Sequence, residues 1–347
     1  MININGFELG KGKTMIIAEL SANHGGSIDL AIKTIKAAKE AGADAVKLQT
    51  YRADTITIKS NRREFVISNG SIWDGLTFYD LYEKSYTPWQ WHEILKKEAE
   101  KLGLILFSSP FDNSAVDFLE SINMPAYKIA SFEITDVNLI EYVAKKQKPV
   151  IISTGIAEKE DIEKAINACY KAGNKDVVLL KCTSSYPAPI DEANLKAITY
   201  LKDVFNVPVG LSDHTMDNNV AVAAVALGAV IIEKHFILDK SIDSADSSFS
   251  MTPVEFKSMV QSIRTVESAL GEANLTLTKS QIKGKAYARS LYAVSDIKKG
   301  SIINENNIKS IRPSNGLHPE FFKNIIGKIA KRDISKGEPL SFDMFVN

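Results

Sequence analysis

The sequence predicts an α/β protein, a (β/α)₈ TIM barrel followed by a small β-rich domain. Eight short apolar segments rich in β-branched residues recur along the chain, and each is followed by a polar turn and a stretch with helical periodicity. Apolar runs that alternate with amphipathic helices are typical of parallel strands buried on both faces. The 347 residues also exceed a typical barrel of about 250 residues, which leaves room for a second domain.

The predicted strands are, in order, MIIAEL (15–20), AVKLQT (45–50), LILFSS (104–109), AYKIAS (126–131), PVIIST (149–154), VVLLKC (177–182), VPVGLS (207–212) and VIIEKH (230–235). In a barrel of this class the active site lies at the C-terminal ends of the strands. We expect the polar side chains at those ends to converge on one mouth. They are Glu19, Lys47, Gln49, Ser108, Ser109, Lys128, Ser131, Ser153, Lys181, Ser212, His214 and His235.

The barrel domain is predicted to span residues 1–270 and to begin with a short hairpin over residues 1–13. A long segment, residues 51–87, separates the second and third strands and is rich in aromatic residues. Loops of this length are usually lids or binding loops. The last barrel helix is predicted over residues 253–270, with Thr252 as its N-cap.

The second domain is predicted after Gly271, which is expected to stop the last barrel helix. Residues 271–285 lack periodicity and indicate a linker. Residues 286–347 contain short β-like runs and two similar turn-strand pieces, KKGSII and SKGEPL. Because a domain of about 60 residues is marginally stable by itself, we expect it to dock on another surface.

Composition argues against several classes of function. The chain has 42 Lys and Arg and 42 Asp and Glu, which argues against a nucleic-acid-binding surface. It has no window of about 18 apolar residues that would span a membrane, and its start lacks the apolar core of a signal peptide. Cys169 and Cys182 fall in a predicted helix and strand, so we expect reduced core thiols. The expected location is the cytoplasm.

Two histidines end neighbouring predicted strands, His214 in SDHT (212–215) and His235 in EKHF (233–236). Two neutral imidazoles close together can bind one divalent metal ion and leave positions open for water and substrate. Oxygen ligands from substrate and water favour Mn²⁺, with Mg²⁺ or Co²⁺ as alternatives. The other interpretation is that each histidine only packs or forms hydrogen bonds.

Lysines interrupt four of the apolar strands, at Lys47, Lys128, Lys181 and Lys234. Lysine is rarely buried without a partner, so several at one mouth indicate an anionic ligand such as a phosphate or carboxylate. Alternatively, strand alternation points some of them, above all Lys181 and Lys234, into the layer between sheet and helices, where they pair with acids. The hydroxyl donors suited to phosphate oxygens are Ser109, Ser131, Ser153 and Ser212.

Glu19 ends the first predicted strand, in MIIAELSANHGGS. Its carboxylate suits a general base or the orientation of a sugar hydroxyl. A salt bridge with Lys47 on the next strand is an alternative that is compatible with either role. For His24, in the loop that follows, a ligand role and a structural role both stay open.

Eight motifs occur in a fixed order: IAELSANHGGS, AVKLQTY, LFSSPFD, YKIASFE, IISTGIA, CTSSYP, GLSDHT and EKHF. Together they closely resemble the sialic acid synthase family, whose members condense phosphoenolpyruvate with an amino-sugar. The tail segments ARSLYAVSDIKKGSII and IRPSNGLHP resemble the antifreeze-like (SAF) domain that closes these synthases. The resemblance covers nearly the whole chain.

Two segments narrow the resemblance within the family. SIWDGLTFYDLYEKSYTPWQWH and DSADSSFSMTP resemble pseudaminic acid synthases more than neuraminic acid synthases. This implies a 2,4-diacetamido-2,4,6-trideoxy-altrose substrate, with N-acetylneuraminate or legionaminate synthesis from a mannosamine-type sugar as the alternative. Among the aromatic residues of 71–92, we expect Trp91 in the core and others in an apolar wall for the sugar's methyl group.

The resemblance also implies residue roles. The catalytic residues would be Glu19, His214 and His235, of which the two histidines would hold the metal ion. The phosphoenolpyruvate-binding residues would be Lys47, Ser109, Lys128, Ser131, Ser153, Ser185 and Ser212. The sugar-binding residues would be Glu19, Gln49, Tyr186, Asp246 and Arg312. Arg312 would come from the partner subunit of a two-fold homodimer, whose SAF domain caps the barrel. Ser109 and Ser185 stand where neuraminic synthases often have Thr and Asn.

The implied reaction begins when the enol carbon of phosphoenolpyruvate attacks a sugar aldehyde polarised by the metal ion. Water then adds and phosphate leaves, giving a nine-carbon 2-keto acid sugar. Two distant alternatives remain. One is a Schiff-base aldolase with Lys128 or Lys181 as nucleophile, which needs no metal. The other is a non-enzymatic carbohydrate- or ice-binding protein, suggested by the tail alone.

Overall fold

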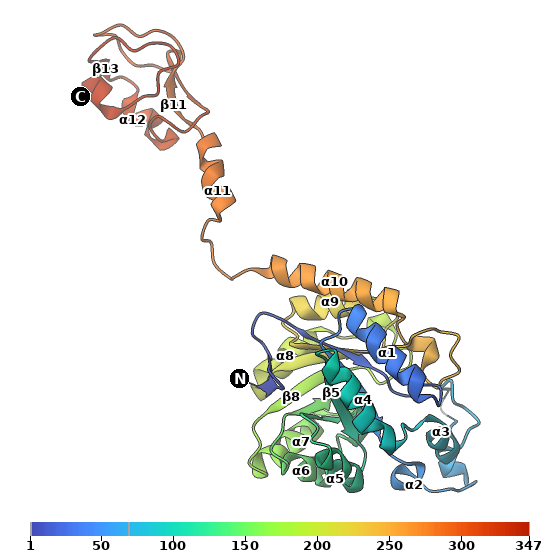
Figure 1. Ribbon diagram of the computed structural model, residues 1–347. Helices are drawn as coiled ribbons and strands as arrows, with labels where there is room; N and C mark the ends of the chain where they lie inside the picture. The colour runs from blue at the N-terminus through green and yellow to red at the C-terminus, as the bar shows by residue number, and fades with distance from the viewer. Residues whose placement is uncertain (1, 69, 347) are drawn as a thin grey trace. The chain divides into compact units, whose positions relative to one another are not determined.

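The computed structural model describes residues 2–68 and 70–346. The chain divides into two compact units, Met1–Gly271 and Glu272–Asn347, which Figure 1 colours from blue to orange and from orange to red. Each unit encloses a hydrophobic core of its own.

Eight parallel strands close into a barrel in the order β10-β3-β4-β5-β6-β7-β8-β9. They are β3 (Met15–Glu19), β4 (Ala45–Thr50), β5 (Ile105–Pro110), β6 (Tyr127–Ile129), β7 (Val150–Ser153), β8 (Val177–Cys182), β9 (Val209–Asp213) and β10 (Ile231–His235). Strands that are neighbours in sequence pair with each other, and β10 pairs with β3 to close the barrel. The eight predicted strands are confirmed, with ends that differ by at most two residues.

Two predicted strand ends differ by two residues, the start of β9 and the end of β6. Ser131 was predicted to end that strand, but it begins a 3₁₀ helix, η2 (Ser131–Glu133). The chain turns here because the Glu133 N–H donates to the Ala130 carbonyl at 3.1 Å. Ser131 is still buried beside the strand end.

Helices cover the outside of the barrel (Figure 1). They are α1 (Ile28–Glu40), α4 (Trp89–Lys101), α5 (Asn113–Ser121), α6 (Val137–Ala144), α7 (Lys159–Lys171), α8 (Lys196–Phe205), α9 (Asn219–Ala226) and α10 (Pro253–Leu270). The Thr252 side chain caps α10 by accepting from the Glu255 N–H, and Gly271 follows its last turn, as predicted. Trp91 packs against the core, also as predicted. No helix in the described part of the chain has the length and apolarity to cross a membrane.

The long segment over residues 51–87 is not a plain loop. It contains α2 (Ala53–Ile56), η1 (Arg63–Phe65) and α3 (Phe78–Ser85). The Thr77 hydroxyl accepts a hydrogen bond from the Asp80 N–H at 3.1 Å, so it caps the first turn of α3. Helices this short contain too few turns for a periodic apolar pattern to reveal them.

The N-terminal hairpin pairs β1 (Asn3–Ile4) with β2 (Phe7–Glu8), as predicted. Its apolar side chains join those at the start of the barrel strands in one interior core, which includes Ile2, Ile4, Leu9, Met15, Ala45, Ile105 and Ala126. The hairpin therefore plugs the N-terminal end of the barrel, and the C-terminal end remains as the mouth.

Side chains alternate between the two faces of each strand. In β10, Ile231 belongs to the core inside the barrel and Ile232 to the core beneath the helices. Glu233 and His235 consequently face the barrel interior, and Lys234 faces the helices. This alternation decides which polar strand residues reach the mouth.

The second unit is β-rich, as predicted. β11 (Ser290–Ala293) pairs with β12 (Ile308–Ile311), and β13 (Ile329–Ala330) pairs with β14 (Phe345–Val346). The short helices of this unit are α11 (Lys279–Gly284), η5 (Lys285–Tyr287), η6 (Pro319–Phe321), α12 (Phe322–Ile325) and η7 (Phe342–Met344). Helix α11 lies within the segment for which the sequence predicted a linker.

The two similar pieces KKGSII and SKGEPL form equivalent turns. Gly300 and Gly337 both have a φ of 86°, a conformation that favours glycine. Ile297 and Ile334 exchange backbone hydrogen bonds of 2.8 Å in both directions. The sequence similarity between the two pieces thus corresponds to a paired arrangement in the small core.

Candidate active site

Most of the predicted strand-end side chains face the barrel interior, as their alternation with core residues indicates. The inward-facing set is Glu19, Lys47, Gln49, Ser109, Lys128, Ser153, Ser212 and His235. Two members of the predicted set, Ser108 and Lys181, fall on the outward face of their strands, as Lys234 also does. The Ser108 hydroxyl pairs with that of Thr50 at 2.6 Å, and Lys181 donates to the Thr183 hydroxyl at 2.6 Å. Lys234 pairs with an acid, as the alternative interpretation expected.

A buried cluster of two lysines and two glutamates lies at the centre of the mouth. Lys47 Nζ is 2.7 Å from Glu19 Oε2 and 3.6 Å from Glu233 Oε1. Lys128 Nζ is 3.7 Å from the same Glu233 oxygen. Lys47 also donates to the Ser109 hydroxyl at 3.2 Å. The salt bridge expected between Glu19 and Lys47 is therefore present.

Burial and mutual charge set the protonation of this cluster. Burial raises the pKa of Glu19 to about 7, although Lys47 opposes the shift. Burial acts the same way on Glu233, but Lys128 and Lys47 outweigh it and hold its pKa below the usual range. Burial also lowers the pKa of Lys128. Glu233 thus carries the firm negative charge, and Glu19 is poised to gain or lose a proton near neutrality.

Several polar atoms of the mouth are buried without a hydrogen-bond partner in the protein. Counting partners among the described residues, they include Ser153 Oγ, Glu133 Oε2, Glu233 Oε2 and His235 Nδ1. Leaving such atoms unsatisfied costs roughly 1–3 kcal/mol each. Their concentration in one place indicates that a polar ligand completes the site.

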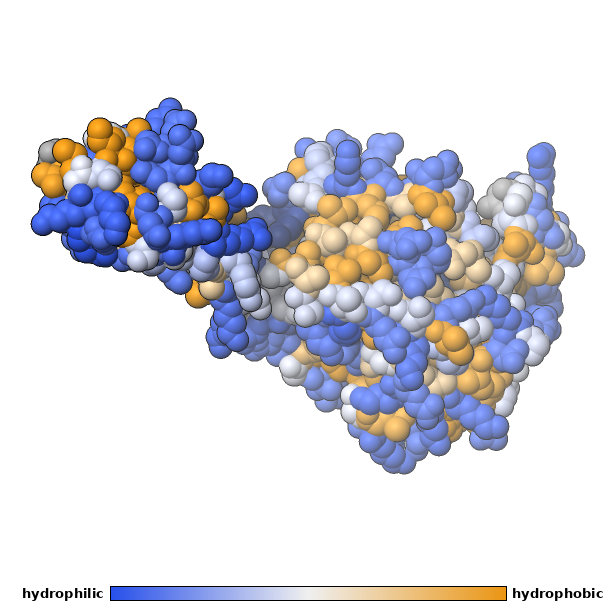
Figure 2. All heavy atoms as spheres, turned by 90° about the horizontal axis from the view of Figure 1, so that it is seen from above, coloured by the Kyte–Doolittle hydropathy of each residue, from blue (hydrophilic) through white to orange (hydrophobic). Residues whose placement is uncertain are grey.

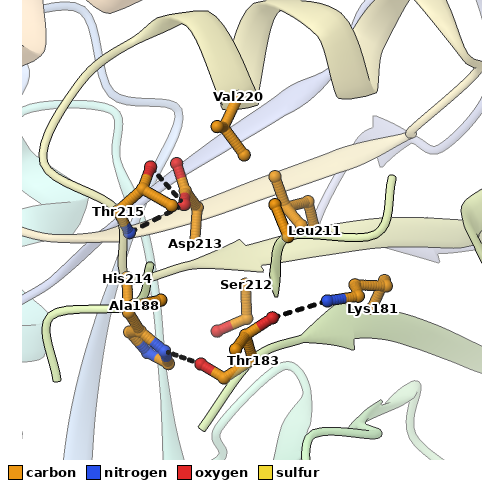
Figure 3. Close-up of a pocket in the computed structure, with 10 residues that line it drawn as sticks. Lys181, Thr183, Ala188, Leu211, Ser212, Asp213, His214, Thr215 and Val220 are labelled. Atoms are coloured by element: carbon orange, nitrogen blue, oxygen red, sulfur yellow. Dashed lines mark hydrogen bonds between the residues drawn. The ribbon is translucent and has the colours of Figure 1, made fainter. Parts of the chain in front are cut away.

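His214 and His235 lie side by side, with ring centroids 5.3 Å apart. His214 Nδ1 is 2.9 Å from the Thr183 carbonyl oxygen (Figure 3), so this nitrogen carries the proton and Nε2 keeps a free lone pair. Burial and the neighbouring His214 lower the pKa of His235 well below its ordinary value. The nearest acid to His235 Nδ1 is Asp246, at 3.6 Å.

These features fit a metal ion held by two imidazoles. The hydrogen bond from His214 fixes its ring as metal-site histidines are usually fixed, and the neutral His235 ring keeps a lone pair for a metal. Among the described residues, no three His, Cys, Asp or Glu side chains form a metal-binding group, so water and substrate would supply the remaining ligands. Cys182 Sγ lies 3.8 Å from His214 Nδ1. This contact raises the pKa of His214, whereas burial lowers it. A bound metal ion would take the place of the second proton that the raised pKa favours on this ring.

A cavity of about 540 Å³ adjoins the histidines. Its polar lining includes Gln49, Glu133, Asp246 and His235, and its aromatic lining is Tyr51, Trp73, Phe78, Tyr82, Phe111, Phe132 and Tyr186. Gln49 Nε2 donates to Glu19 Oε1 at 3.2 Å, which ties the cavity to the charged cluster. Trp73, Phe78 and Tyr82, which lie in the segment 71–92 where the aromatic wall is predicted, line this cavity.

Trp73 anchors the long 51–87 segment beside this cavity by a hydrogen bond to the loop after β10. Its indole N–H donates to the Ala245 carbonyl at 3.1 Å, and its ring centroid lies 5.8 Å from that of Tyr186. Tyr186 in turn lies 4.4 Å from the His214 ring. A lid residue is therefore in contact with the aromatic shell of the histidine pair.

The remaining predicted residues do not all contact the lysine–glutamate cluster. Ser212 donates to Glu233 Oε1 at 3.3 Å and so belongs to the cluster. The Ser185 hydroxyl donates to the Pro187 carbonyl at 3.2 Å instead. Arg312 follows β12 in the second unit and is exposed. His24 accepts from the Gly26 N–H at 3.1 Å and packs edge-on against Trp91. Its Nε2 is buried without a hydrogen-bond partner among the described residues, so a structural role and a ligand role both stay open.

Sequence reasoning missed three titratable residues of the mouth. Glu233 is in the EKHF motif, and its two-residue spacing from His235 puts both on the same face. Glu133 lines the cavity, and burial raises its pKa to about 7. Burial raises the pKa of the Cys182 thiol, but its hydrogen bond to His214 outweighs this and brings the pKa to about 7. Both cysteines are free and buried, as predicted.

Comparison with known proteins agrees with this geometry. The chain matches the NeuB family over residues 34–274 and the SAF domain over residues 288–346. It is 51% identical to pseudaminic acid synthase of Campylobacter jejuni (strain 81-176), over 94% of this chain and 95% of that protein. It is 38% identical to N,N'-diacetyllegionaminic acid synthase of Campylobacter jejuni, over 94% and 98% of the two chains.

Among solved structures, the chain resembles the N-acetylneuraminic acid (sialic acid) synthetase of Leptospira borgpetersenii in complex with citrate. The TM-score is 0.73 at 31% identity, over 82% of this chain and 94% of that chain. The closed eight-stranded barrel, the SAF match and the near full-length similarity agree with one another, and the chain belongs to the NeuB family.

Proposed function

We propose that this protein condenses phosphoenolpyruvate with 2,4-diacetamido-2,4,6-trideoxy-altrose to give a nine-carbon 2-keto acid sugar and phosphate, the reaction of a pseudaminic acid synthase. One observation carries the proposal: a buried lysine–glutamate cluster with unsatisfied polar atoms adjoins an aromatic-walled cavity. The 51% identity to a protein of that name supports it.

Phosphoenolpyruvate would bind at the lysine cluster. Among the residues that the structure describes, Lys128 has only the Ile129 carbonyl, at 3.3 Å, within hydrogen-bond distance, so its ammonium group keeps donors for an anionic oxygen. Ser153 Oγ has no partner in the protein and would donate to the same ligand. Lys47, Ser109, Ser131 and Ser212 would complete this subsite, whereas Ser185 would first have to release the Pro187 carbonyl.

A divalent metal ion, Mn²⁺ before Mg²⁺ or Co²⁺, would be held by His214 and His235. Such an ion would supply Lewis-acid polarisation of the sugar aldehyde. The protein's own part is to hold the two rings with free nitrogens toward the mouth and to exclude bulk water with the lid. Lys47 and Lys128 would neutralise the phosphate and carboxylate of phosphoenolpyruvate while its enol carbon attacks.

The amino-sugar would occupy the aromatic cavity. Gln49, Asp246 and Tyr186 would contact its polar groups near the histidines, and Glu19 would orient a hydroxyl or take the proton of the attacking water. Trp73, Phe78 and Tyr82 provide an apolar surface for a methyl group. A 6-deoxy sugar presents a methyl group where a mannosamine-type sugar presents a hydroxyl, and a hydroxyl buried there would lack a partner.

We also propose a two-fold homodimer in which Arg312 of one subunit serves the other's sugar site. Helix α9 contains no charged residue, and Leu227 directly after it is 40% exposed. Hydrophobic residues also gather on the barrel face seen in Figure 2. Leu275 is 99% exposed in the segment before α11. Exposed apolar residues of this kind suit contacts with a second copy.

The two buried free cysteines suit a cytoplasmic location.

Product analysis tests the proposed function. The full-length protein is incubated with phosphoenolpyruvate, Mn²⁺ and an equimolar mixture of the trideoxy-altrose sugar and N-acetylmannosamine, and the products are identified by mass spectrometry. We expect the nine-carbon acid of the trideoxy sugar to predominate and Lys128→Ala to form none. Predominant N-acetylneuraminate would move the protein to the neuraminate branch, and absence of any nine-carbon acid would refute the proposal.

A further inference from the structure

Lys234 is a buried lysine that the proposed chemistry does not use. Its Nζ lies 2.6 Å from Asp213 Oδ2 and donates to the carbonyl oxygens of Thr215, at 2.5 Å, and Asp217, at 3.2 Å. Only 1% of its surface is exposed. An ammonium group has three protons, and the protein supplies an acceptor for each, so Lys234 has no donor left for a ligand.

Asp213 extends this network into the loop after β9. Its Oδ1 accepts from the Thr215 N–H at 3.0 Å and from the Thr215 hydroxyl at 2.9 Å. Figure 3 shows Asp213 and Thr215 pointing to one side of the chain and His214 pointing to the other, toward Thr183. One carboxylate thus binds the neighbouring strand through Oδ2 and the loop through Oδ1.

The position of this network relative to the histidines is the key observation. His214 lies between Asp213 and Thr215 in the sequence, and His235 directly follows Lys234. Lys234 and Asp213 are also direct partners in the pairing of β10 with β9. Successive side chains point to opposite faces of a strand. The ion pair on the outer face therefore fixes the same stretch of backbone that carries both imidazoles on the inner face.

We propose that the Lys234–Asp213 ion pair is a positioning device that sets the separation of the two imidazoles. The inference rests on the proposed metal site. A buried ion pair contributes little net stability compared with an apolar pair of similar size, and registry is its best-attested use. The Lys234–Asp213 pair joins β9, β10 and the loop after β9, which carry the rings of His214 and His235. The relative position of these segments sets the distance between the two rings, and that distance matters if both rings bind one metal ion.

Titration of the full-length, metal-free protein with Mn²⁺ tests this, with free Mn²⁺ followed by electron paramagnetic resonance. We expect Lys234→Met to weaken Mn²⁺ binding by roughly 10- to 100-fold, the usual effect of removing a group that orients a metal ligand. Asp213→Asn should weaken it less, because the amide oxygen can still accept from Thr215. Ser108→Ala is the matched control: it also breaks a buried outward-facing polar pair, but away from the histidines, and should leave Mn²⁺ affinity unchanged.

A double variant shows whether a loss of Mn²⁺ affinity comes from misfolding of the single variant. Lys234→Met/Asp213→Leu removes both charges, which proteins often tolerate, and should show the same loss of Mn²⁺ affinity. In the metal-free state, the imidazole NMR signals of His214 and His235 should move in Lys234→Met and stay in Ser108→Ala. Native Mn²⁺ affinity in a folded Lys234→Met or double variant overturns the inference. Native Mn²⁺ affinity in His214→Ala would instead overturn the metal site itself.

Discussion

Two buried lysines of the barrel, Lys128 on β6 and Lys234 on β10, differ in how the protein satisfies them. Their exposed fractions are 2% and 1%. Lys234 has a carboxylate at 2.6 Å and two carbonyl acceptors. Lys128 has one carbonyl at 3.3 Å, and its nearest carboxylate oxygen is at 3.7 Å. Both lysines are therefore equally buried. They differ in the number of hydrogen-bond acceptors around the ammonium group, which distinguishes a structural lysine from one that can still bind a ligand.

The same contrast holds between the two faces of the strands. On the outer face, the Ser108 and Thr50 hydroxyls pair with each other, and Thr50 also pairs with His92 at 2.8 Å. On the inner face, Ser153 Oγ and His235 Nδ1 have no hydrogen-bond partner within residues 2–68 and 70–346. The outward-facing polar groups satisfy one another, whereas the inward-facing ones lack partners, as expected where we propose that the substrates bind.

The largest expected effect is the loss of the histidine pair on the inner face. His214→Ala or His235→Ala should lower turnover by roughly 10³-fold or more, because a Lewis acid contributes several kcal/mol to the transition state. Circular dichroism should show a native fold in both variants. Steady-state rates measured before and after exhaustive EDTA treatment check the cause: undiminished activity without metal would remove the basis of this prediction and favour a Schiff-base enzyme.

A smaller effect is expected from Glu19, the inner-face carboxyl with a pKa raised by burial to about 7. If Glu19 accepts a proton in the reaction, it must be ionised, so activity should rise with pH up to about 7 and level off above it. Glu19→Gln should lower kcat/KM by roughly 10²-fold and remove this inflection. An unchanged pH profile in Glu19→Gln would assign the titration to another group.

The third prediction concerns a residue outside the barrel. Arg312→Ala and His235→Ala subunits, each inactive alone, should regain activity when mixed, because a mixed dimer contains one site with both residues intact. Complete exchange of a two-fold dimer predicts about a quarter of native activity. Subunit exchange is confirmed separately with tagged chains. If exchange occurs and no activity returns, Arg312 acts within its own chain or not at all.

The contrast between the two faces also explains what the sequence could and could not predict. The eight strands were predictable because β-branched apolar runs are buried on both faces of a barrel. Position near a strand end does not place Ser108 at the mouth, because alternation along β5 points it outward, and the outward alternative that alternation offered for Lys181 is the one the structure has. Glu233 was missed, although its spacing from His235 puts both inward.

Other features depend on contacts that no local pattern encodes. Trp73 reaches the Ala245 carbonyl across 172 residues of sequence, and the cavity takes its shape because residues 51–87 fold onto the loop after β10. The short helices within residues 51–87 have too few turns to show periodicity. The turn at Ser131 depends on one backbone hydrogen bond after β6, which the apolar run preceding it does not reveal.

Missing hydrogen-bond partners, and not burial, distinguish Lys128, the lysine that we propose binds phosphoenolpyruvate, from Lys234. Calorimetric titration of phosphoenolpyruvate into metal-free native protein, Lys128→Met and Lys234→Met tests it most directly. The account predicts that Lys128→Met weakens phosphoenolpyruvate binding by roughly 10²-fold, as expected for removal of a buried charged contact, while Lys234→Met keeps near-native affinity. Equal losses in both variants, or native affinity in Lys128→Met, would contradict it.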